Sequence, residues 1–256
     1  MGHSRRRTPD LIRGEVDWIN FLAAGGAGVA RAIASENGEL VEEIPDEKDG
    51  VFLASAFVRA PGGPVWEMGG WTDALIETYG NQLGRIHALS KTYTVGDEAW
   101  RRPEWDDPLM QYASREMEPV IEKYHEVMSH LQALPQDSEG YGMIHQDAHA
   151  GNFFVGEKGE ITLFDFDDCV YGHFAYDLAM VLFYAVTNRE DAAENTLDAA
   201  WQKEIAHFMK LREIDLYALV MRDYDSLEGD AWVETFLDGR RERIVNGMPY
   251  LETFNS

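Results

Sequence analysis

The sequence predicts an α+β fold with a small mixed front lobe and a large, mostly helical back lobe. Short extended runs lie before residue 60, whereas long helical patterns dominate from Trp71 onward. A β-prone pattern over residues 152–165 interrupts the helical part and predicts a hairpin there. We therefore expect the chain to divide into lobes of residues 1–60 and 61–256.

The front lobe is expected to begin with a helix and to continue with two strands. Val16, Ile19 and Leu22 are apolar at helical spacing, and the glycines that follow them provide the stop. The runs 39–44 and 51–58 favour extended structure and are separated by the turn-rich segment PDEKDG, so an antiparallel pair is expected. RAPGGP then breaks regular structure.

The back lobe is predicted to be built from long helices. Four segments have apolar residues at helical spacing: Ala74–Leu89, Leu109–Leu134, Ala175–Thr187 and Ala192–Leu211. With 256 residues and 45% apolar content, the chain can bury a sizeable core.

Net charge, apolar run length and cysteine content exclude several classes of protein. The formal net charge of -24 repels nucleic acid and favours cationic partners, or else the acids only solvate the surface. The longest apolar run, Leu178–Val186, is too short to cross a membrane. Cys169 is the single cysteine and is expected to be a packed side chain rather than a reactive thiol. We expect a cytoplasmic protein that binds neither nucleic acid nor membrane.

The hairpin pattern consists of NFFV and ITLF on either side of GEKGE. A tight turn with its tip at residues 158–159 would pair Phe153 with Phe164 and Asn152 with Asp165. The predicted hairpin therefore brings an amide and a carboxylate together at its open end.

These groups favour metal and phosphate chemistry. Amide and carboxylate oxygens are hard ligands suited to Mg²⁺, which takes its remaining contacts from water and phosphates. Asp147 lies five residues before Asn152 and can reach the same place, where a carboxylate could accept a proton from a hydroxyl group. Asp167 and Asp168 fit either a cationic substrate or second metal, or simple surface solvation.

His145, Asp147 and Asn152 form H-x-D-x-x-x-x-N, and Asp165 follows in FDFDD. Together with YDLA at residues 176–179, these segments resemble the catalytic and metal-binding segments of the protein-kinase-like small-molecule kinases. That group includes aminoglycoside phosphotransferases, choline kinases and homoserine kinase-like proteins. The resemblance implies a two-lobed protein-kinase-like fold with a reduced N-terminal nucleotide lobe and a C-terminal catalytic and substrate lobe.

The resemblance also implies roles for individual residues. Asp147 would be the catalytic base, and Asn152 and Asp165 would bind Mg²⁺. His145 would brace the loop, and Asp177 would hold that loop from a buried helix.

The roles of two further histidines, His149 and His87, have structural alternatives. His149 stands where protein kinases often carry a phosphate-facing lysine, so it is expected either to contact phosphate or to pack the loop. His87 is expected to be a hydrogen-bonded helix residue rather than a catalytic one.

The front lobe resembles the family less closely. Glu15 is similar to the helix glutamate that pairs with a strand lysine, yet no lysine precedes Lys48. The three strands that would carry the glycine-rich loop and the lysine need, with their turns, about 25 residues, and only 14 precede Glu15. Either the true start lies upstream, or the reduced lobe binds nucleotide less well. Adenine would be held by backbone groups of the hinge, formed by Phe57, Val58, Arg59 and Ala60.

The leading hypothesis is an ATP- and Mg²⁺-dependent kinase that phosphorylates a hydroxyl group of a small, amine-bearing molecule. Competing interpretations are a protein-serine kinase of the stress-response type, a non-catalytic nucleotide-binding pseudokinase, and a zinc hydrolase that uses His145 and His149. The sequence does not identify the acceptor or the oligomeric state.

Overall fold

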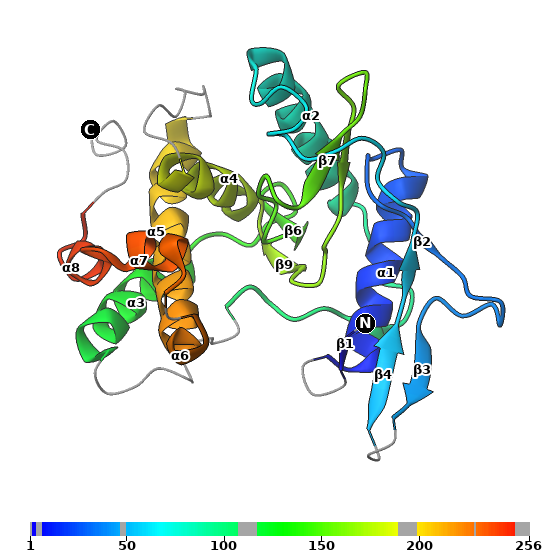
Figure 1. Cartoon of the computed structure of the whole chain (residues 1–256), viewed down its shortest axis with the longest axis horizontal. Helices are drawn as coiled ribbons and strands as arrows, with labels where there is room; N and C mark the ends of the chain where they lie inside the picture. Colours follow the sequence, from blue (N-terminus) through cyan, green and yellow to red (C-terminus); the bar gives the residue numbers. More distant parts are fainter. Residues whose placement is uncertain are drawn as a thin grey trace. The chain divides into compact units, whose positions relative to one another are not determined.

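Figure 1 shows the computed structural model, which describes residues 2–3, 7–46, 50–106, 117–188, 199–227 and 229–248. The chain forms two compact units, each assembled from two separate stretches of sequence. The first unit contains Met1–Trp105 and Ser138–Asp177, and the second contains Asp106–Asp137 and Leu178–Ser256. The boundary expected at residues 60 and 61 lies inside the first unit, because the hairpin of residues 153–163 is bonded to the N-terminal segments.

The first unit opens with the predicted helix, α1 (Pro9–Ala24). Thr8 caps it by accepting a hydrogen bond from the amide of Leu11, and Pro9 occupies the first turn. The buried side of α1 packs on a small sheet through a hydrophobic cluster that contains Ile12, Val16, Ala32, Val41 and Leu53.

Two short sheets accompany α1. One has the order β1 (Gly2–His3), β4 (Val51–Ala54) and β3 (Glu42–Pro45); the other pairs β2 (Ala32–Ile33) with β5 (Ala56–Phe57). The expected antiparallel pairing of the two extended runs is confirmed by β3 and β4. The run 51–58 is nevertheless divided after Ala54, because its second part leaves β3 and pairs with β2.

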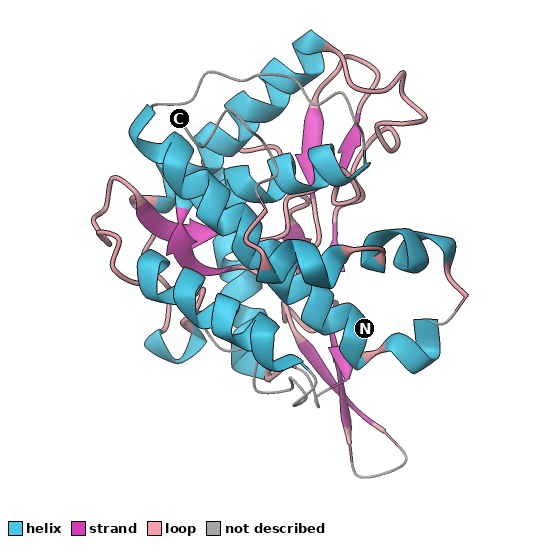
Figure 2. Ribbon diagram, turned by 90° about the vertical axis from the view of Figure 1, so that its left-hand side faces the viewer, coloured by secondary structure: helices cyan, strands magenta, loops and turns pink. Residues whose placement is uncertain are grey.

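The remaining elements of the first unit include the predicted hairpin and the strands and helices that flank the motif loop. They are α2 (Asp73–Ser90), the 3-10 helix η1 (Glu98–Trp100), and the strand pairs β6 (Tyr141–Ile144) with β9 (Val170–His173) and β7 (Phe153–Val155) with β8 (Ile161–Leu163). The strands are shorter than the main helices (Figure 2). The helix expected at Ala74–Leu89 is confirmed by α2.

The hairpin β7–β8 exists, but its expected register is wrong by one residue. Phe153 pairs with Leu163 rather than with Phe164. The loop holds three residues, since the amide of Gly156 bonds to the carbonyl of Glu160 at 2.8 Å. Gly159 has φ +81°, the left-handed conformation that closes such a three-residue loop, and the extra loop residue shifts every pair.

Both outer edges of the hairpin are bonded to chain segments from the N-terminal part. The amide of Val155 donates to the carbonyl of Gly63 at 2.8 Å, and the amide of Leu163 donates to the carbonyl of Gly28 at 2.9 Å. A Cβ at Gly28 would lie 2.2 Å from the carbonyl oxygen of Ile161, so this close backbone approach requires glycine. The hairpin is thereby fixed within the first unit.

The second unit is helical in its described residues. It contains α3 (Glu118–Leu131), most of α4 (Phe174–Asn188), α5 (Ala199–Arg222), α6 (Tyr224–Leu227), α7 (Ala231–Leu237) and α8 (Arg240–Val245). The expected helices at Leu109–Leu134, Ala175–Thr187 and Ala192–Leu211 correspond to α3, α4 and α5. Residues 107–116 and 189–198 lie outside the described part, and α5 continues to Arg222.

A buried acid joins two of these helices. Glu213 on α5 is fully buried and accepts hydrogen bonds from Lys210 Nζ at 2.5 Å and Arg240 at 3.0 Å. Arg243 lies 3.3 Å from the same carboxylate. Among the described residues, no helix is both long and apolar enough to cross a membrane.

Candidate active site

The loop between β6 and β7 carries the histidine, aspartate and asparagine of the motif. Asn152 donates from Nδ2 to the carbonyl oxygen of Asp147 at 2.8 Å and to its Oδ2 at 3.2 Å. Nε2 of His149 lies 3.5 Å from the same Oδ2. The structure therefore brings Asp147, His149 and Asn152 together and holds the carboxylate of Asp147 in one orientation.

A buried aspartate on α4 holds the start of this loop. Asp177 is fully buried, and its carboxylate accepts the backbone amides of His145 at 3.1 Å and Gln146 at 2.8 Å. Gln146 has φ +67°, which is unfavourable for a residue other than glycine. The bond to Asp177 keeps the loop in this conformation. Nε2 of His87, on α2, lies 3.0 Å from Asp177 Oδ2, so His87 is a hydrogen-bonded helix residue as expected.

His145 connects the loop to the end of the hairpin. Its Nε2 lies 3.1 Å from the carbonyl oxygen of Phe164, and its Nδ1 accepts the amide of Asp147 at 3.3 Å. The ring also packs against Phe166, with 4.3 Å between ring centroids. Both ring nitrogens are occupied, so His145 cannot serve as a zinc ligand in this conformation. The zinc-hydrolase alternative, which needs His145 with His149, does not fit.

Asp165 follows the hairpin directly. Because of the register shift, Asn152 lies opposite Phe164, whose amide donates to the Asn152 carbonyl at 2.9 Å, and the expected pairing of Asn152 with Asp165 is wrong. Asp165 is the next residue, and its φ of +62° turns the chain away from the strand. Partial desolvation raises the pKa of Asp165; the charge of His145 opposes this shift, and nearby carboxylates, including Asp147, reinforce it.

The donor set fits a hard divalent cation. Within the described ranges, no hydrogen bond is donated to the Asp165 carboxylate or to Oδ1 of Asn152, although the Asn152 side chain is otherwise buried and bonded. Asp165 follows Phe164, the residue opposite Asn152, and its carboxylate is influenced by the charge of Asp147. These carboxylate and amide groups are the oxygen ligands that Mg²⁺ or Ca²⁺ takes.

Two further residues anchor the site, and the sequence reasoning missed both. Arg102 is 4% exposed and donates to the carbonyl oxygens of Cys169 at 2.8 Å, Leu11 at 2.9 Å and Asp167 at 2.6 Å, so it ties the FDFDD segment to α1. Tyr79 on α2 donates its hydroxyl to the carbonyl of Ala148. Neither residue lies in a recognisable motif, and only the tertiary fold reveals these contacts.

Glu15 lies on α1 near the acids of FDFDD. Burial is the main cause that raises its pKa to about 7; Asp167 and Asp165 add to the rise, whereas Arg102 and Arg7 oppose it. The expected glutamate therefore faces arginines rather than a lysine. Arg7 itself pairs with Asp167 and Asp168, so these acids have a cationic partner within the chain.

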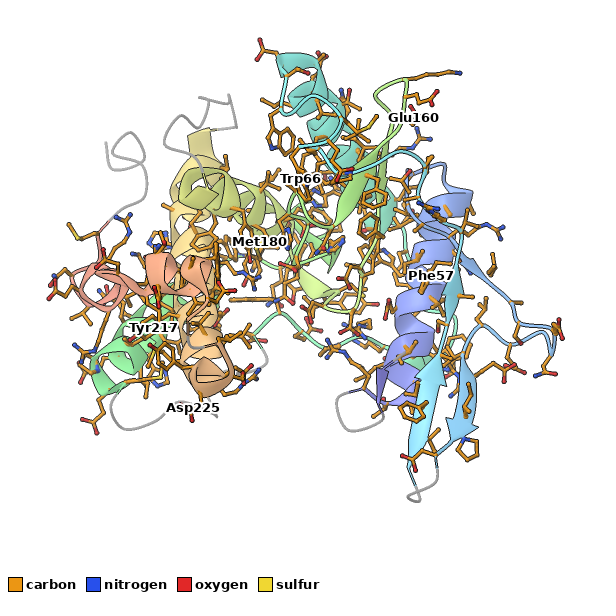
Figure 3. The ribbon with its side chains drawn as sticks, viewed as in Figure 1. Phe57, Trp66, Glu160, Met180, Tyr217 and Asp225 are labelled. Carbon is orange, nitrogen blue, oxygen red and sulfur yellow. The ribbon has the colours of Figure 1, made fainter. Side chains whose placement is uncertain are left out.

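The residues expected to form the hinge lie at the end of β5 and just after it. The amide of Val58 is bonded to the carbonyl of Arg31 at 2.8 Å. The alternation of an antiparallel ladder then points the N–H and C=O of Phe57 away from β2. The Phe57 side chain is 40% exposed on the first unit (Figure 3), whereas Ala60 is buried.

Cys169 is fully buried, and this burial raises the pKa of its thiol to about 12. The expectation that it is a packed side chain is confirmed.

Comparison with known proteins decides the family. The sequence profile of the phosphotransferase enzyme family matches residues 2–214. The chain belongs to this family. Amicoumacin kinase of Bacillus subtilis (strain 168) is 34% identical over 271 residues, which cover 96% of this chain and 80% of that protein.

Solved structures agree with this assignment. Amicoumacin kinase hAmiN, in complex with AMP-PNP, Ca²⁺ and Ami, superposes with a TM-score of 0.86 at 30% identity, over 98% of this chain and 82% of that chain. A microcompartment-associated aminopropanol kinase has a TM-score of 0.71 at 18% identity, over 94% and 83% of the two chains, and supports the fold alone.

The family assignment confirms three expectations. The fold is the α+β protein-kinase-like fold that the motif implied. The chain is an enzyme of the phosphotransferase class, and its reaction transfers a phosphoryl group to a hydroxyl group of a small molecule.

Proposed function

We propose that this phosphotransferase is an ATP- and Mg²⁺-dependent kinase of the cytoplasm whose acceptor is an amine-bearing small molecule, with amicoumacin as the first compound to test. The observation that carries the proposal is the grouping of Asp147, Asn152 and Asp165 around one loop and hairpin end. The similarity to two amicoumacin kinases supports the acceptor class. The net charge of -24 also favours a cationic acceptor.

In this proposal, Asn152 has two tasks. Its Nδ2 orients the carboxylate of Asp147, and its Oδ1 stands with Asp165 as a ligand for the cation. Asn152 and Asp165 would hold the Mg²⁺ ion, whose positive charge would offset the negative charge of the phosphates.

Asp147 would receive the hydroxyl group of the acceptor and accept its proton as the oxygen attacks the γ-phosphorus in line. The bond between the γ-phosphorus and the β–γ bridging oxygen would break, and ADP would leave with that oxygen. His149, close to the same carboxylate, would either contact phosphate or pack the loop, where its Nδ1 accepts the amide of Gly151 at 2.9 Å. The hinge from Phe57 to Ala60 would hold adenine through its backbone, as the outward N–H and C=O of Phe57 allow.

The proposal is tested by incubating the full chain with ATP, Mg²⁺ and either amicoumacin or a panel of amino alcohols, and by detecting the phosphorylated product by mass spectrometry. Asp147→Asn serves as the active-site control. It should reduce transfer by about 100-fold to 10,000-fold while AMP-PNP still binds. Undiminished transfer by Asp147→Asn would exclude the assigned base. Nucleotide binding without transfer to any acceptor would favour the non-catalytic alternative.

A further inference from the structure

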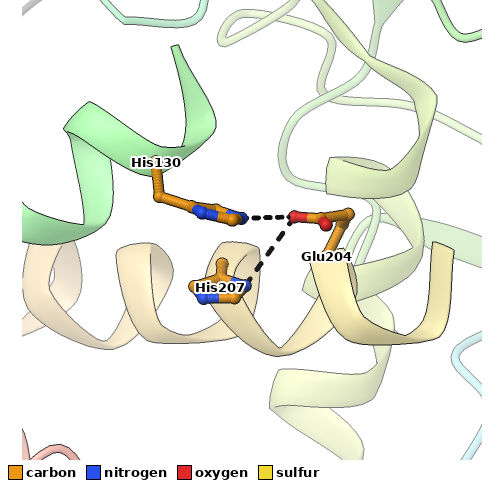
Figure 4. A group of neighbouring side chains, drawn as sticks. All are labelled: His130, Glu204 and His207. Atoms are coloured by element: carbon orange, nitrogen blue, oxygen red, sulfur yellow. Dashed lines mark hydrogen bonds and ion pairs between the residues drawn. The ribbon is translucent and has the colours of Figure 1, made fainter. Parts of the chain in front are cut away.

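A second group of metal-ligating side chains lies in the second unit, where α3 and α5 pack together. His130 comes from α3, and Glu204 and His207 come from α5 (Figure 4). Nε2 of His130 lies 2.6 Å from Oε2 of Glu204, and Nδ1 of His207 lies 3.8 Å from the same oxygen. One potential ligand atom from each residue lies within 4.8 Å of the others.

The arrangement on α5 is suited to metal binding. Glu204 and His207 are three residues apart, and residues at this spacing share one face of a helix. Glu-x-x-His is the pattern by which helical bundles supply a carboxylate and an imidazole to a metal ion. His130 adds the third ligand from the neighbouring helix, with its ring stacked on that of His207 at 3.9 Å between centroids.

We propose that His130, Glu204 and His207 form a Zn²⁺ site. Two imidazoles and one carboxylate are a recognised three-ligand zinc set that leaves a fourth position to water. Bonds of about 2.0–2.2 Å in a tetrahedral site place ligand atoms roughly 3.3–3.6 Å apart. To reach this spacing the 2.6 Å contact of His130 with Glu204 must widen and the 3.8 Å contact of His207 with Glu204 must shorten. The three side chains are 44%, 20% and 40% exposed, which leaves room for such side-chain rotations.

The site would join the two sequence segments that make up the second unit. α3 belongs to residues 106–137, whereas α5 follows only after residues 138–177 have contributed to the first unit. A metal ion held by both helices would bind the folded unit and not the unfolded chain, and it would therefore raise thermal stability. At about 100 times its dissociation constant, the ion should raise Tm by roughly 5–10 °C. This function is separate from phosphoryl transfer.

The test measures zinc binding to the full chain after removal of any affinity tag and of chelators. Titration calorimetry and Co²⁺ substitution, which gives strong visible absorption in a tetrahedral site, should both report one such site per chain. His130→Ala and His207→Ala should each weaken Zn²⁺ binding by about 10-fold or more. The Tm rise with Zn²⁺ should vanish in both variants.

Two controls separate this site from other zinc ligands. His125→Ala removes an exposed histidine from the same helix α3 and should bind Zn²⁺ as the parent does. Asp165→Ala disables the proposed active-site cation position and should likewise keep the Zn²⁺ affinity and the Tm rise. If an alanine variant unfolds, Glu204→Gln provides a second test, because glutamine keeps the shape of the side chain but is a weaker zinc ligand than a carboxylate. The proposal is overturned if the parent binds no zinc, or if Glu204→Gln and the histidine variants bind it as tightly as the parent.

Discussion

Arg7 donates two hydrogen bonds to the carboxylate of Asp167, at 2.8 Å from Nε to Oδ1 and at 2.9 Å from Nη2 to Oδ2. The same Nη2 lies 2.7 Å from Oδ1 of Asp168. The hydrogen bond to Asp167 is the main cause that raises the pKa of Arg7. Arg7, which precedes α1, thus partly neutralises Asp167 and Asp168. Glu15 on α1 has no lysine partner in the described residues.

Arg7→Ala is expected to raise the KM for ATP by about 3-fold to 10-fold, with a smaller effect on kcat. The acids left behind would repel the triphosphate by roughly 1 kcal/mol, the upper end of the values measured for solvent-exposed charge pairs. The effect should shrink in high salt. Arg13→Ala is the matched control, because Arg13 pairs with Asp10 and Glu43 instead. Equal KM changes in both variants would contradict the prediction.

Glu15 should make stability depend on pH in an unusual direction. Burial raises its pKa from 4.5 to about 7 in the folded chain. Between these values the folded state holds a proton that the unfolded state has lost, so the free energy of unfolding falls as pH rises from about 5 to 7. The total is at most about 3 kcal/mol.

Glu15→Gln removes this penalty. Compared with the parent, the variant should be more stable by about 1–3 kcal/mol at pH 8 and nearly unchanged at pH 5. Urea unfolding at the two pH values measures the difference. Glu39→Gln alters an exposed acid and should show little effect at either pH. A gain in stability that is the same at both pH values would argue against burial of an ionised Glu15.

The sequence predicted local structure well where a pattern was long. Apolar spacing located α2 within one residue at each end, since Ala74–Leu89 was expected and Asp73–Ser90 is observed, and the glycines after Leu22 correctly marked the end of α1. The hairpin was found but its register was not, because the loop length depends on the left-handed conformation of Gly159, and the sequence also allows a two-residue turn.

The motif residues of the loop, Asp147, His149 and Asn152, contact one another, whereas the predicted pairing of Asn152 with Asp165 is wrong by one residue. Arg102 escaped prediction because its three acceptors come from segments far away in the sequence. The contact of His130 with Glu204 was not predicted for the same reason, since the two residues are 74 positions apart in the sequence.

Asp165→Ala is expected to remove the metal dependence of nucleotide binding. The variant loses the accessible carboxylate that we assign to the cation, so AMP-PNP affinity in Mg²⁺ should fall by about 10-fold or more. Calorimetric titrations in Mg²⁺ and in EDTA measure this change. Asp168→Ala removes a nearby acid of the same motif and should retain the Mg²⁺ dependence. Identical titrations of Asp165→Ala and the parent would place the cation elsewhere.

Asp177→Ala should weaken both the fold and catalysis. The carboxylate accepts two backbone amides, and each such charged hydrogen bond contributes about 1.5–3 kcal/mol. We therefore expect the free energy of unfolding to fall by roughly 3–5 kcal/mol, and kcat to fall because Gln146 can relax from its left-handed conformation and displace Asp147.

His87→Phe is the matched control for Asp177→Ala. It removes a single hydrogen bond to Asp177 but can keep the ring stacked on Phe174, now at 4.6 Å between centroids. Its cost should stay near 1–2 kcal/mol, with kcat largely preserved. Urea unfolding and steady-state kinetics on both variants separate the two contributions. If His87→Phe lost as much kcat as Asp177→Ala, the contact with α2, rather than the two loop amides, would control the position of Asp147.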